Sequence, residues 1–150
     1  MTIDLYCVMG NPVQHSRSPW IHSRFAELTG QCLQYGKRLV PLNGFANALH
    51  AFIDDGGKGC SVPFKFDAAK LATHCSERAK LAQASNTLHI KDGQIFADNT
   101  DGVGLVNDIQ RNAGLALQGR EVLLIGAGGA ASGVLAPLLQ AGPAKLTVAN

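Results

Sequence analysis

The chain has 150 residues, and a single domain of about this length buries roughly two thirds of its unfolded surface. Only 16% of the residues are charged and 17 are glycine, a composition that excludes an intrinsically disordered protein. The formal net charge of +2 is too small to indicate a nucleic-acid-binding or membrane-surface protein.

Strand and helix patterns alternate through the first part of the chain. A helix is expected to begin at Ser18, which can cap it, and to end at Gly30. The apolar residues of this helix, Ile21, Phe25 and Leu28, fall on one face. The segments predicted here are strands at 5–9, 33–40 and 60–62, and helices at 18–30, 45–53, 67–73 and 76–83.

A β-hairpin follows, with strands at 86–90 and 94–97 joined by Lys91, Asp92 and Gly93, because Asp-Gly supplies the turn chemistry. The next segments are a helix from about 101 to 112, a strand at 121–125, a helix at 129–141 and a strand at 145–149. This alternation predicts an α/β fold with a mostly parallel sheet. We place a domain boundary in the helix between Asp101 and Gly114, which gives domains of residues 1–102 and 103–150.

Residues 122–144 carry no charge, and a run of this length could in principle span a membrane. Five glycines and two prolines interrupt it, so a strand, a glycine turn and a buried helix explain the run better. Pro137 lies inside that helix and is expected to kink it mildly, since the small Gly133 stands one turn earlier.

The four cysteines form no CxxC pair, and the five histidines show no HxH or HExxH spacing, so no metal site is predicted. Scattered cysteines in an α/β pattern favour a reduced, intracellular protein. The N-terminus shows no signal peptide, and we therefore expect a cytoplasmic protein.

Residues 126–131 read G-A-G-G-A-A and fit the dinucleotide fingerprint G-x-G-x-x-A between a strand and a helix. Gly126 permits the tight turn, Gly128 lets the backbone approach a pyrophosphate, and Ala131 permits close helix–strand packing. The alternative is a glycine turn that binds nothing. The residue that selects NAD or NADP is expected about 20 positions after the glycines. The predicted cofactor-binding residues are Gly126, Ala127, Gly128, Gly129, Ala130, Ala131 and Asn150.

Polar side chains gather at the predicted strand ends and loops of the first hundred residues. They lie in three motifs: G-N-P-V-Q-H-S-R-S-P at 10–19, V-P-F-K at 62–65, and S-N-T at 85–87 together with D-N-T-D-G at 98–102. Because α/β proteins bind ligands at strand ends, the group could hold a small polyhydroxylated molecule. Singly, Ser18 and Asp101 could be helix caps, and Lys65 could be a solvated surface lysine.

At these residues the chain resembles the shikimate dehydrogenase family, which also includes shikimate/quinate dehydrogenases, along its entire length. The resemblance implies a substrate-binding and catalytic domain followed by a Rossmann-type NADP-binding domain. It also implies reversible NADP-dependent reduction of 3-dehydroshikimate to shikimate in aromatic amino-acid biosynthesis, by a monomer or homodimer. Residues 103–150 then correspond to a linker helix and the first β-α-β of an incomplete cofactor domain.

The resemblance also assigns roles to single residues. Ser16 and Ser18 are expected to bind the substrate carboxylate, Lys65 and Asp101 to form the catalytic pair, and Asn86 to hydrogen-bond the substrate. Ser61, also expected to bind substrate, stands where the family has asparagine. Hydride transfer at a carbinol carbon requires proton transfer at its oxygen, so Lys65 either moves that proton or orients the oxygen.

Two departures from the family pattern accompany these matches. The segment before Lys65 is about two residues short, so either the strand and loop are shortened or Lys65 is displaced from Asp101. The cofactor domain is truncated, and an unpaired sheet edge predicts poor stability or self-association. Alternative functions are a dual quinate/shikimate dehydrogenase and a non-catalytic fragment that binds substrate without turnover.

Overall fold

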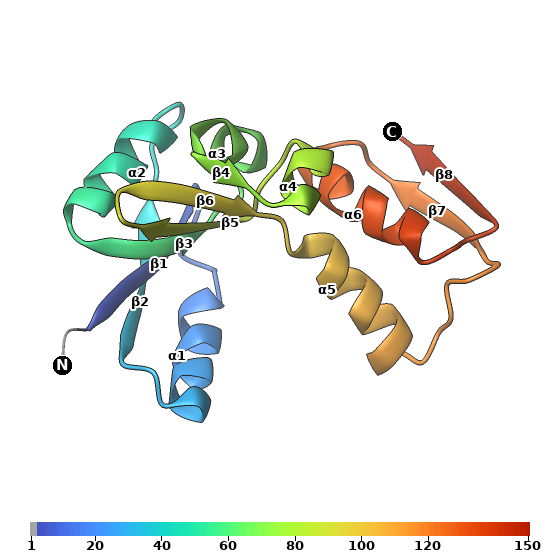
Figure 1. Cartoon of the computed structure of the whole chain (residues 1–150), viewed down its shortest axis with the longest axis horizontal. Helices are drawn as coiled ribbons and strands as arrows, with labels where there is room; N and C mark the ends of the chain where they lie inside the picture. The colour runs from blue at the N-terminus through green and yellow to red at the C-terminus, as the bar shows by residue number, and fades with distance from the viewer. Residues whose placement is uncertain (1–2) are drawn as a thin grey trace.

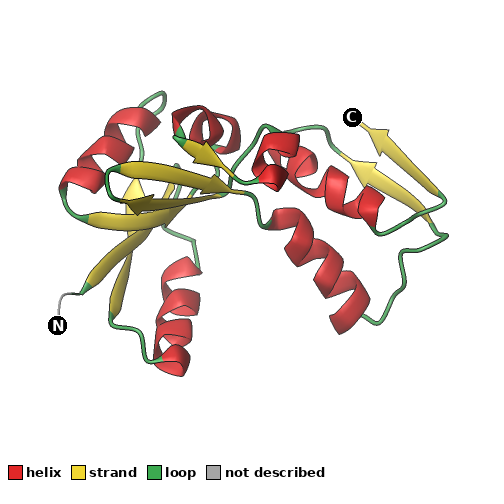
Figure 2. Cartoon of the chain, viewed as in Figure 1, coloured by secondary structure: helices red, strands yellow, loops and turns green. Residues whose placement is uncertain are grey.

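The structure is a computed structural model, and it describes residues 3–150 (Figures 1 and 2). One sheet has six strands in the order β2-β1-β3-β5-β6-β4, and a separate two-stranded sheet pairs β7 with β8. The strands are β1 (Asp4–Gly10), β2 (Leu33–Leu39), β3 (Gly57–Ser61), β4 (His74–Cys75), β5 (Thr87–Lys91), β6 (Gln94–Asp98), β7 (Glu121–Ile125) and β8 (Lys145–Ala149). The helices are α1 (Ser18–Thr29), α2 (Phe45–Asp54), α3 (Lys65–Leu71), α4 (Glu77–Ala82), α5 (Asp101–Asn107) and α6 (Gly129–Gln140).

The predicted α/β fold with mostly parallel strands is confirmed. β1 pairs in parallel with both β2 and β3, and β4 pairs in parallel with β6. Only the hairpin strand β5 makes antiparallel pairings, with β3 and β6. Asp92 and Gly93 both have positive φ, 52° and 73°, as the two-residue turn of a hairpin requires.

The main hydrophobic core lies under α2 on the six-stranded sheet. Phe45, Leu49 and Phe52 follow helical spacing and are buried from α2. They meet buried strand residues such as Met9 and Leu88 in one continuous cluster. This packing fixes the edge of the sheet at which β1 and β3 end.

Helix α1 forms as predicted, but the predicted cap is wrong. Ser18 is the first helical residue, and Arg17 at the N-cap makes no side-chain capping bond. The face of Ile21, Phe25 and Leu28 is exposed, and only Ala26 is buried. Gly30 ends the helix in the left-handed conformation, φ 66°, as expected.

Several element boundaries differ from the sequence predictions. β3 begins at Gly57, where a Cβ would collide with the Phe52 ring, so close packing rather than strand propensity starts this strand. The two-residue strand β4 has no counterpart among the predicted segments. α5 ends at Asn107 and continues as a π-helical turn over Asp108–Asn112. α6 runs through Pro137 without a break. α4 is capped by Ser76, whose hydroxyl oxygen accepts from the Ala79 N–H at 3.2 Å.

Residues after α5 form a smaller unit in which α6 connects β7 to β8. The parallel pair β7–β8 matches both predicted strands to the residue. Val134 and Leu138 of α6 are buried with Leu117, and Val122 and Leu124 of β7 pack against them. α6 also lies against α4 and α5, so this unit is joined to the larger one through helices (Figure 1). Among the described helices, none has the length and apolar character needed to cross a membrane.

Candidate functional site

A cavity of about 650 Å³ opens at the edge of the six-stranded sheet where β1, β3 and β6 end and β5 begins. Parallel strands that end together bring their loops to one place, and α/β proteins bind ligands there. Five of the six predicted substrate-binding residues line this cavity: Ser16, Ser61, Lys65, Asn86 and Asp101. His15, Thr87 and Thr100 line it as well.

Lys65 and Asp101 form an ion pair in this cavity. The Lys65 ammonium donates to Oδ2 of Asp101, and their side chains are only 17% and 28% exposed. Nδ2 of Asn86 donates to the other carboxylate oxygen, Oδ1, at 2.6 Å. Lys65 is therefore not a solvated surface lysine, and Asp101 is the first residue of α5 rather than its N-cap. The carboxylate holds a lysine and an amide together at the cavity wall.

The short segment before Lys65 does not displace that residue. β3 ends at Ser61, and the Val62 N–H then donates to the Asn86 carbonyl at 2.8 Å. On the other side, the Ser85 N–H donates to the Lys65 carbonyl at 2.8 Å. These two bonds tie the short loop to the segment that carries Asn86. Of the two alternatives raised by the shortening, the structure shows the shortened strand and loop.

Ser16 and Ser18 lie together at the start of α1. The Ser16 hydroxyl donates to Oγ of Ser18 at 3.1 Å, and the Ser18 N–H donates to Oγ of Ser16 at 3.3 Å. Ser16 lines the cavity, whereas Ser18 does not line it and is hydrogen-bonded to Ser16. Two neighbouring hydroxyls at the N-terminus of a twelve-residue helix are suited to an anion such as a carboxylate, because both can donate and the positive end of the helix dipole favours negative charge there.

Tyr35 was missed by the sequence reasoning. Its hydroxyl donates to Oγ of Ser61 at 2.8 Å, and the His22 ring stacks on its ring at a centroid distance of 4.1 Å. Burial raises the pKa of Tyr35, and burial lowers the pKa of His22. The hydroxyl of Ser61 therefore accepts a hydrogen bond from an uncharged tyrosine side chain. No sequence motif marks Tyr35, because its partner lies on β3, which the fold places on the other side of β1 from the strand of Tyr35.

Asp98, the first residue of the D-N-T-D-G motif, anchors that motif and does not line the cavity. Arg78 donates to both of its carboxylate oxygens, from Nε at 2.6 Å and also from Nη2, and the Ser76 hydroxyl donates to Oδ1 at 2.6 Å. The hydrogen bond from Arg78, opposed in part by burial and helped by Ser76, lowers the pKa of Asp98 to about 2. This clamp fixes the end of β6 immediately before Asp101.

The glycine turn lies between β7 and α6, as the fingerprint requires. Gly126 has φ 107°, a value that favours glycine, and its N–H donates to the Ala149 carbonyl at 2.7 Å. A Cβ on Gly128 would meet no atom within 4 Å, so the space above the turn is open to a ligand. α6 begins at Gly129, and Asn150 follows the end of β8 beside the turn. The turn therefore fits a dinucleotide pyrophosphate.

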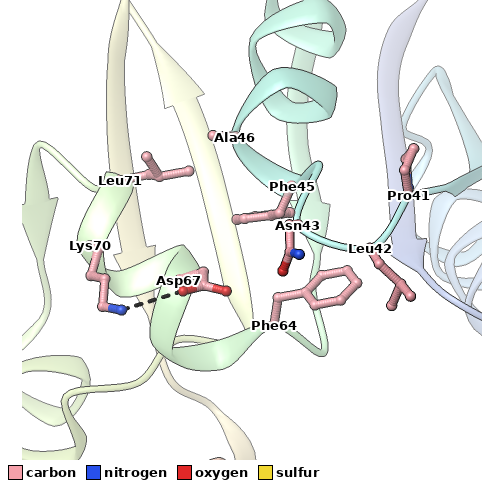
Figure 3. A pocket seen from close by; sticks show the side chains of 9 residues that line it. All are labelled: Pro41, Leu42, Asn43, Phe45, Ala46, Phe64, Asp67, Lys70 and Leu71. Atoms are coloured by element: carbon pink, nitrogen blue, oxygen red, sulfur yellow. Dashed lines mark hydrogen bonds and ion pairs between the residues drawn. The ribbon is translucent and has the colours of Figure 1, made fainter.

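A second hollow, of about 420 Å³, lies between the start of α2 and α3 (Figure 3). It is mainly apolar, with Phe45 and Phe64 at a ring distance of 5.4 Å. Its charged residues, Asp67 and Lys70, already pair with each other at 3.4 Å. None of the predicted site residues lines it, and we assign the chemistry to the cavity at Lys65.

Comparison with known proteins gives matches along nearly the whole chain. A family model described as the shikimate dehydrogenase substrate binding domain matches residues 8–88. The shikimate dehydrogenase (NADP(+)) of Paracidovorax citrulli is 65% identical over 150 residues, which cover 98% of this chain and 53% of the relative. The chain thus spans about half the length of the curated relatives it matches.

Solved structures agree with the sequence matches. Shikimate dehydrogenase from Aquifex aeolicus has a TM-score of 0.90 at 26% identity, covering 99% of this chain and 63% of that one. The shikimate 5-dehydrogenase of Thermus thermophilus, in complex with NADP(H) and shikimate, has a TM-score of 0.86 at 29% identity, covering 97% of this chain and 56% of that one.

Proposed function

The chain belongs to the shikimate dehydrogenase substrate binding domain family, and we propose that it binds shikimate and catalyses its reversible NADP-dependent oxidation to 3-dehydroshikimate. In this proposal, residues 1–102 are the substrate-binding and catalytic domain. Residues 103–150 are the linker helix and the opening β-α-β of the NADP-binding domain. The names of the relatives, which specify NADP(+), support the choice of cofactor.

The observation that carries the proposal is the ion pair of Lys65 and Asp101 with Asn86 in one cavity. Oxidation of a carbinol breaks one C–H and one O–H bond. NADP+, when bound at the glycine turn, would supply the acceptor for the hydride that leaves the carbon. The O–H proton passes to the Lys65 amine when that amine is uncharged, and in the reverse direction the Lys65 ammonium returns it to the carbonyl oxygen.

Asp101 and Asn86 position the reacting oxygen. Asp101 holds the lysine at one carboxylate oxygen and the Asn86 amide at the other, so both groups are kept beside the same carboxylate at the cavity wall. Correct placement of the reacting groups supplies a large part of the rate of an enzyme, and misplacement by about 1 Å can cost about 100-fold. Asp101 is therefore a catalytic residue that fixes Lys65 rather than a second proton carrier.

The remaining predicted residues bind the two molecules. Ser16 and Ser18 take the substrate carboxylate at the start of α1, and Ser61 contacts a ring hydroxyl through the oxygen that Tyr35 also bonds. Gly126 and Gly128 approach the pyrophosphate, and the first N–H groups of α6 donate to it. Residues 127 and 129–131 complete the turn.

Turnover of 3-dehydroshikimate with NADPH, followed by loss of absorbance of the reduced nicotinamide, tests the proposal. We expect Lys65→Ala to lower kcat by about 10²- to 10⁴-fold, the usual contribution of a positioned acid or base. Lys70→Ala is the matched control, because Lys70 lies on the same helix and pairs only with the exposed Asp67. Unchanged turnover in Lys65→Ala would remove Lys65 from the mechanism.

A pH–rate profile separates the two roles of Lys65. If Lys65 carries the proton, Lys65→Arg loses turnover at every pH, because an arginine stays charged. Should Lys65 only orient the oxygen, Lys65→Arg keeps most of its rate and the profile of the parent.

A second candidate function is substrate binding without turnover, which the match of residues 8–88 to a substrate binding domain supports. Calorimetric titration with shikimate, together with the turnover assay, distinguishes the enzyme from a protein that only binds. Heat of binding without any loss of NADPH absorbance identifies binding without turnover. The same assay with quinate distinguishes a dual-specificity enzyme. In each case Ser16→Ala is expected to weaken binding of the carboxylate.

A further inference from the structure

Two residues of the D-N-T-D-G motif, Asn99 and Gly102, have no part in the proposed chemistry, and both face α6. Asn99 is 1% exposed and its amide is held at both ends. Its Nδ2 donates to the Ala84 carbonyl at 2.9 Å, and its Oδ1 accepts the Asp101 N–H at 3.2 Å. Asn99 is thus bonded directly to the backbone of the catalytic carboxylate residue and cannot turn away without leaving buried polar groups unpaired.

Gly133 of α6 lies directly against this amide. A Cβ at Gly133 would be 2.7 Å from both Oδ1 and Nδ2 of Asn99, closer than real Cβ contacts come. The neighbouring contact has the same character, because a Cβ at Gly102 would be 2.5 Å from the Gly133 carbonyl oxygen and from Cγ of Pro137. α5 and α6 therefore meet at two glycines, one from each helix.

The sequence explains why Gly133 can present its carbonyl here. In an α-helix this carbonyl would accept from the N–H of the residue four positions later, and that residue is Pro137, which has no N–H. The Pro137 ring instead packs over Gly102. The proline that was expected to disturb the helix is part of the helix–helix contact.

We propose that Asn99 and Gly133 are positioning residues that set the distance between the cofactor turn and Asp101. This inference rests on the proposed function and deepens it. Gly133 stands four residues after Gly129, about 6 Å along the helix from this first residue of α6. A rigid helix therefore links the pyrophosphate-binding turn to the amide that holds Asp101. Hydride transfer requires the cofactor and the substrate to lie at the correct distance from each other. The contact between Asn99 and Gly133 is therefore expected to affect the rate more than the affinity for substrate.

Adding one methyl group at the contact tests the proposal. Gly133→Ala is expected to lower kcat about 10- to 100-fold while the KM for shikimate stays within about threefold. Gly104→Ala is the matched control, since it adds the same methyl group to α5, two residues after Gly102, where a Cβ meets nothing within 4 Å. The control is expected to keep kcat within about twofold. Equal kinetics in the two variants would overturn the proposal.

A second readout does not depend on turnover. In amide NMR spectra of ¹⁵N-labelled protein, Gly133→Ala should shift the Asn99 side-chain amide and the Asp101 backbone amide, and Gly104→Ala should shift neither. If the parent shows no turnover, the proposed function fails, while these two signals still decide the contact. Unmoved signals in a folded Gly133→Ala protein would refute the contact itself.

A double-mutant cycle covers the case in which Gly133→Ala folds poorly. Asn99→Ser shortens the side chain that the new methyl group would meet. We expect Asn99→Ser alone to lower kcat about tenfold, and the addition of Gly133→Ala to cost less than about threefold more, because the collision is gone. Fully additive losses would show that the two residues act independently and would contradict the proposal.

Discussion

The two sheets of this molecule differ in how completely their apolar residues are covered. Among the residues that the structure describes, the six-stranded sheet contributes to a continuous cluster of thirteen buried residues, whereas the unit of β7 and β8 has three. In that smaller unit α6 covers one face, and Leu123 on the other face is 61% exposed. Parallel sheets are normally covered on both faces. The difference indicates that the cavity at Lys65 is built on the more stable part of the chain and the glycine turn at Gly126 on the less stable part.

The largest effect is expected from truncating one leucine in each core. Leu49→Ala, at a fully buried position of α2, should cost about 3–4 kcal/mol in the free energy of unfolding. Leu138→Ala, in the small cluster of α6, should cost about 2 kcal/mol, because the surroundings can relax toward solvent. Urea unfolding measures both. Equal costs would contradict the contrast between the two cores.

The next effect concerns the clamp on Asp98. Asp98→Asn removes the charge-assisted bonds from Arg78, and we expect a loss of about 1 kcal/mol at neutral pH after allowance for solvent screening. Because folding lowers the pKa of Asp98 to about 2, this stabilisation is complete above the unfolded value near 4 and disappears as the pH falls through 2. The difference between parent and variant should therefore shrink between about pH 4 and pH 2.

The control for this prediction is Asp67→Asn, which removes an exposed carboxylate paired with Lys70 and should change stability by less than about 0.5 kcal/mol. A parent–variant difference for Asp98→Asn that stays constant down to about pH 2 would show that the ion pair does not cause the stabilisation.

Much of the fold could be predicted because its signals are local. The strands at 121–125 and 145–149 are isolated apolar runs, and the hairpin carries its own turn residues. The strand β4 has only two residues, too few for any periodicity. The start of β3 depends on the Phe52 ring, which lies over Gly57. The apolar face of α1 is exposed because no other element of the described chain covers it. These features depend on tertiary contacts that no local pattern records.

The same division holds for the candidate site. Ser16, Lys65, Asn86 and Asp101 could be listed from motifs, and the structure brings them to one edge of the sheet. Tyr35 could not be found, because its partner Ser61 lies 26 residues away on another strand. Arg78 and Asp98, and likewise Asn99 and Gly133, are pairs of the same kind, separated in sequence and brought together only by the fold.

The smallest effect on stability, and the most direct test of the contrast between the sheets, comes from the open face of β7. Leu123→Thr places a β-branched residue in the strand and removes an exposed apolar side chain, so stability should change by less than about 0.5 kcal/mol. Self-association of the parent chain through this exposed apolar face should fall in the Leu123→Thr variant. Sedimentation velocity over a range of concentrations measures the change.

Leu124→Thr is the matched control, because the neighbouring side chain points to the face that packs against α6. That substitution places a hydroxyl in the small core and should destabilise the unit while leaving association through the open face intact. A parent chain that sediments as a monomer at every concentration would show that the exposed face of β7 is not adhesive. In that case the two sheets would differ only in how completely their apolar residues are buried. The glycine turn would then belong to a small unit that is stable with one face of its sheet exposed to water.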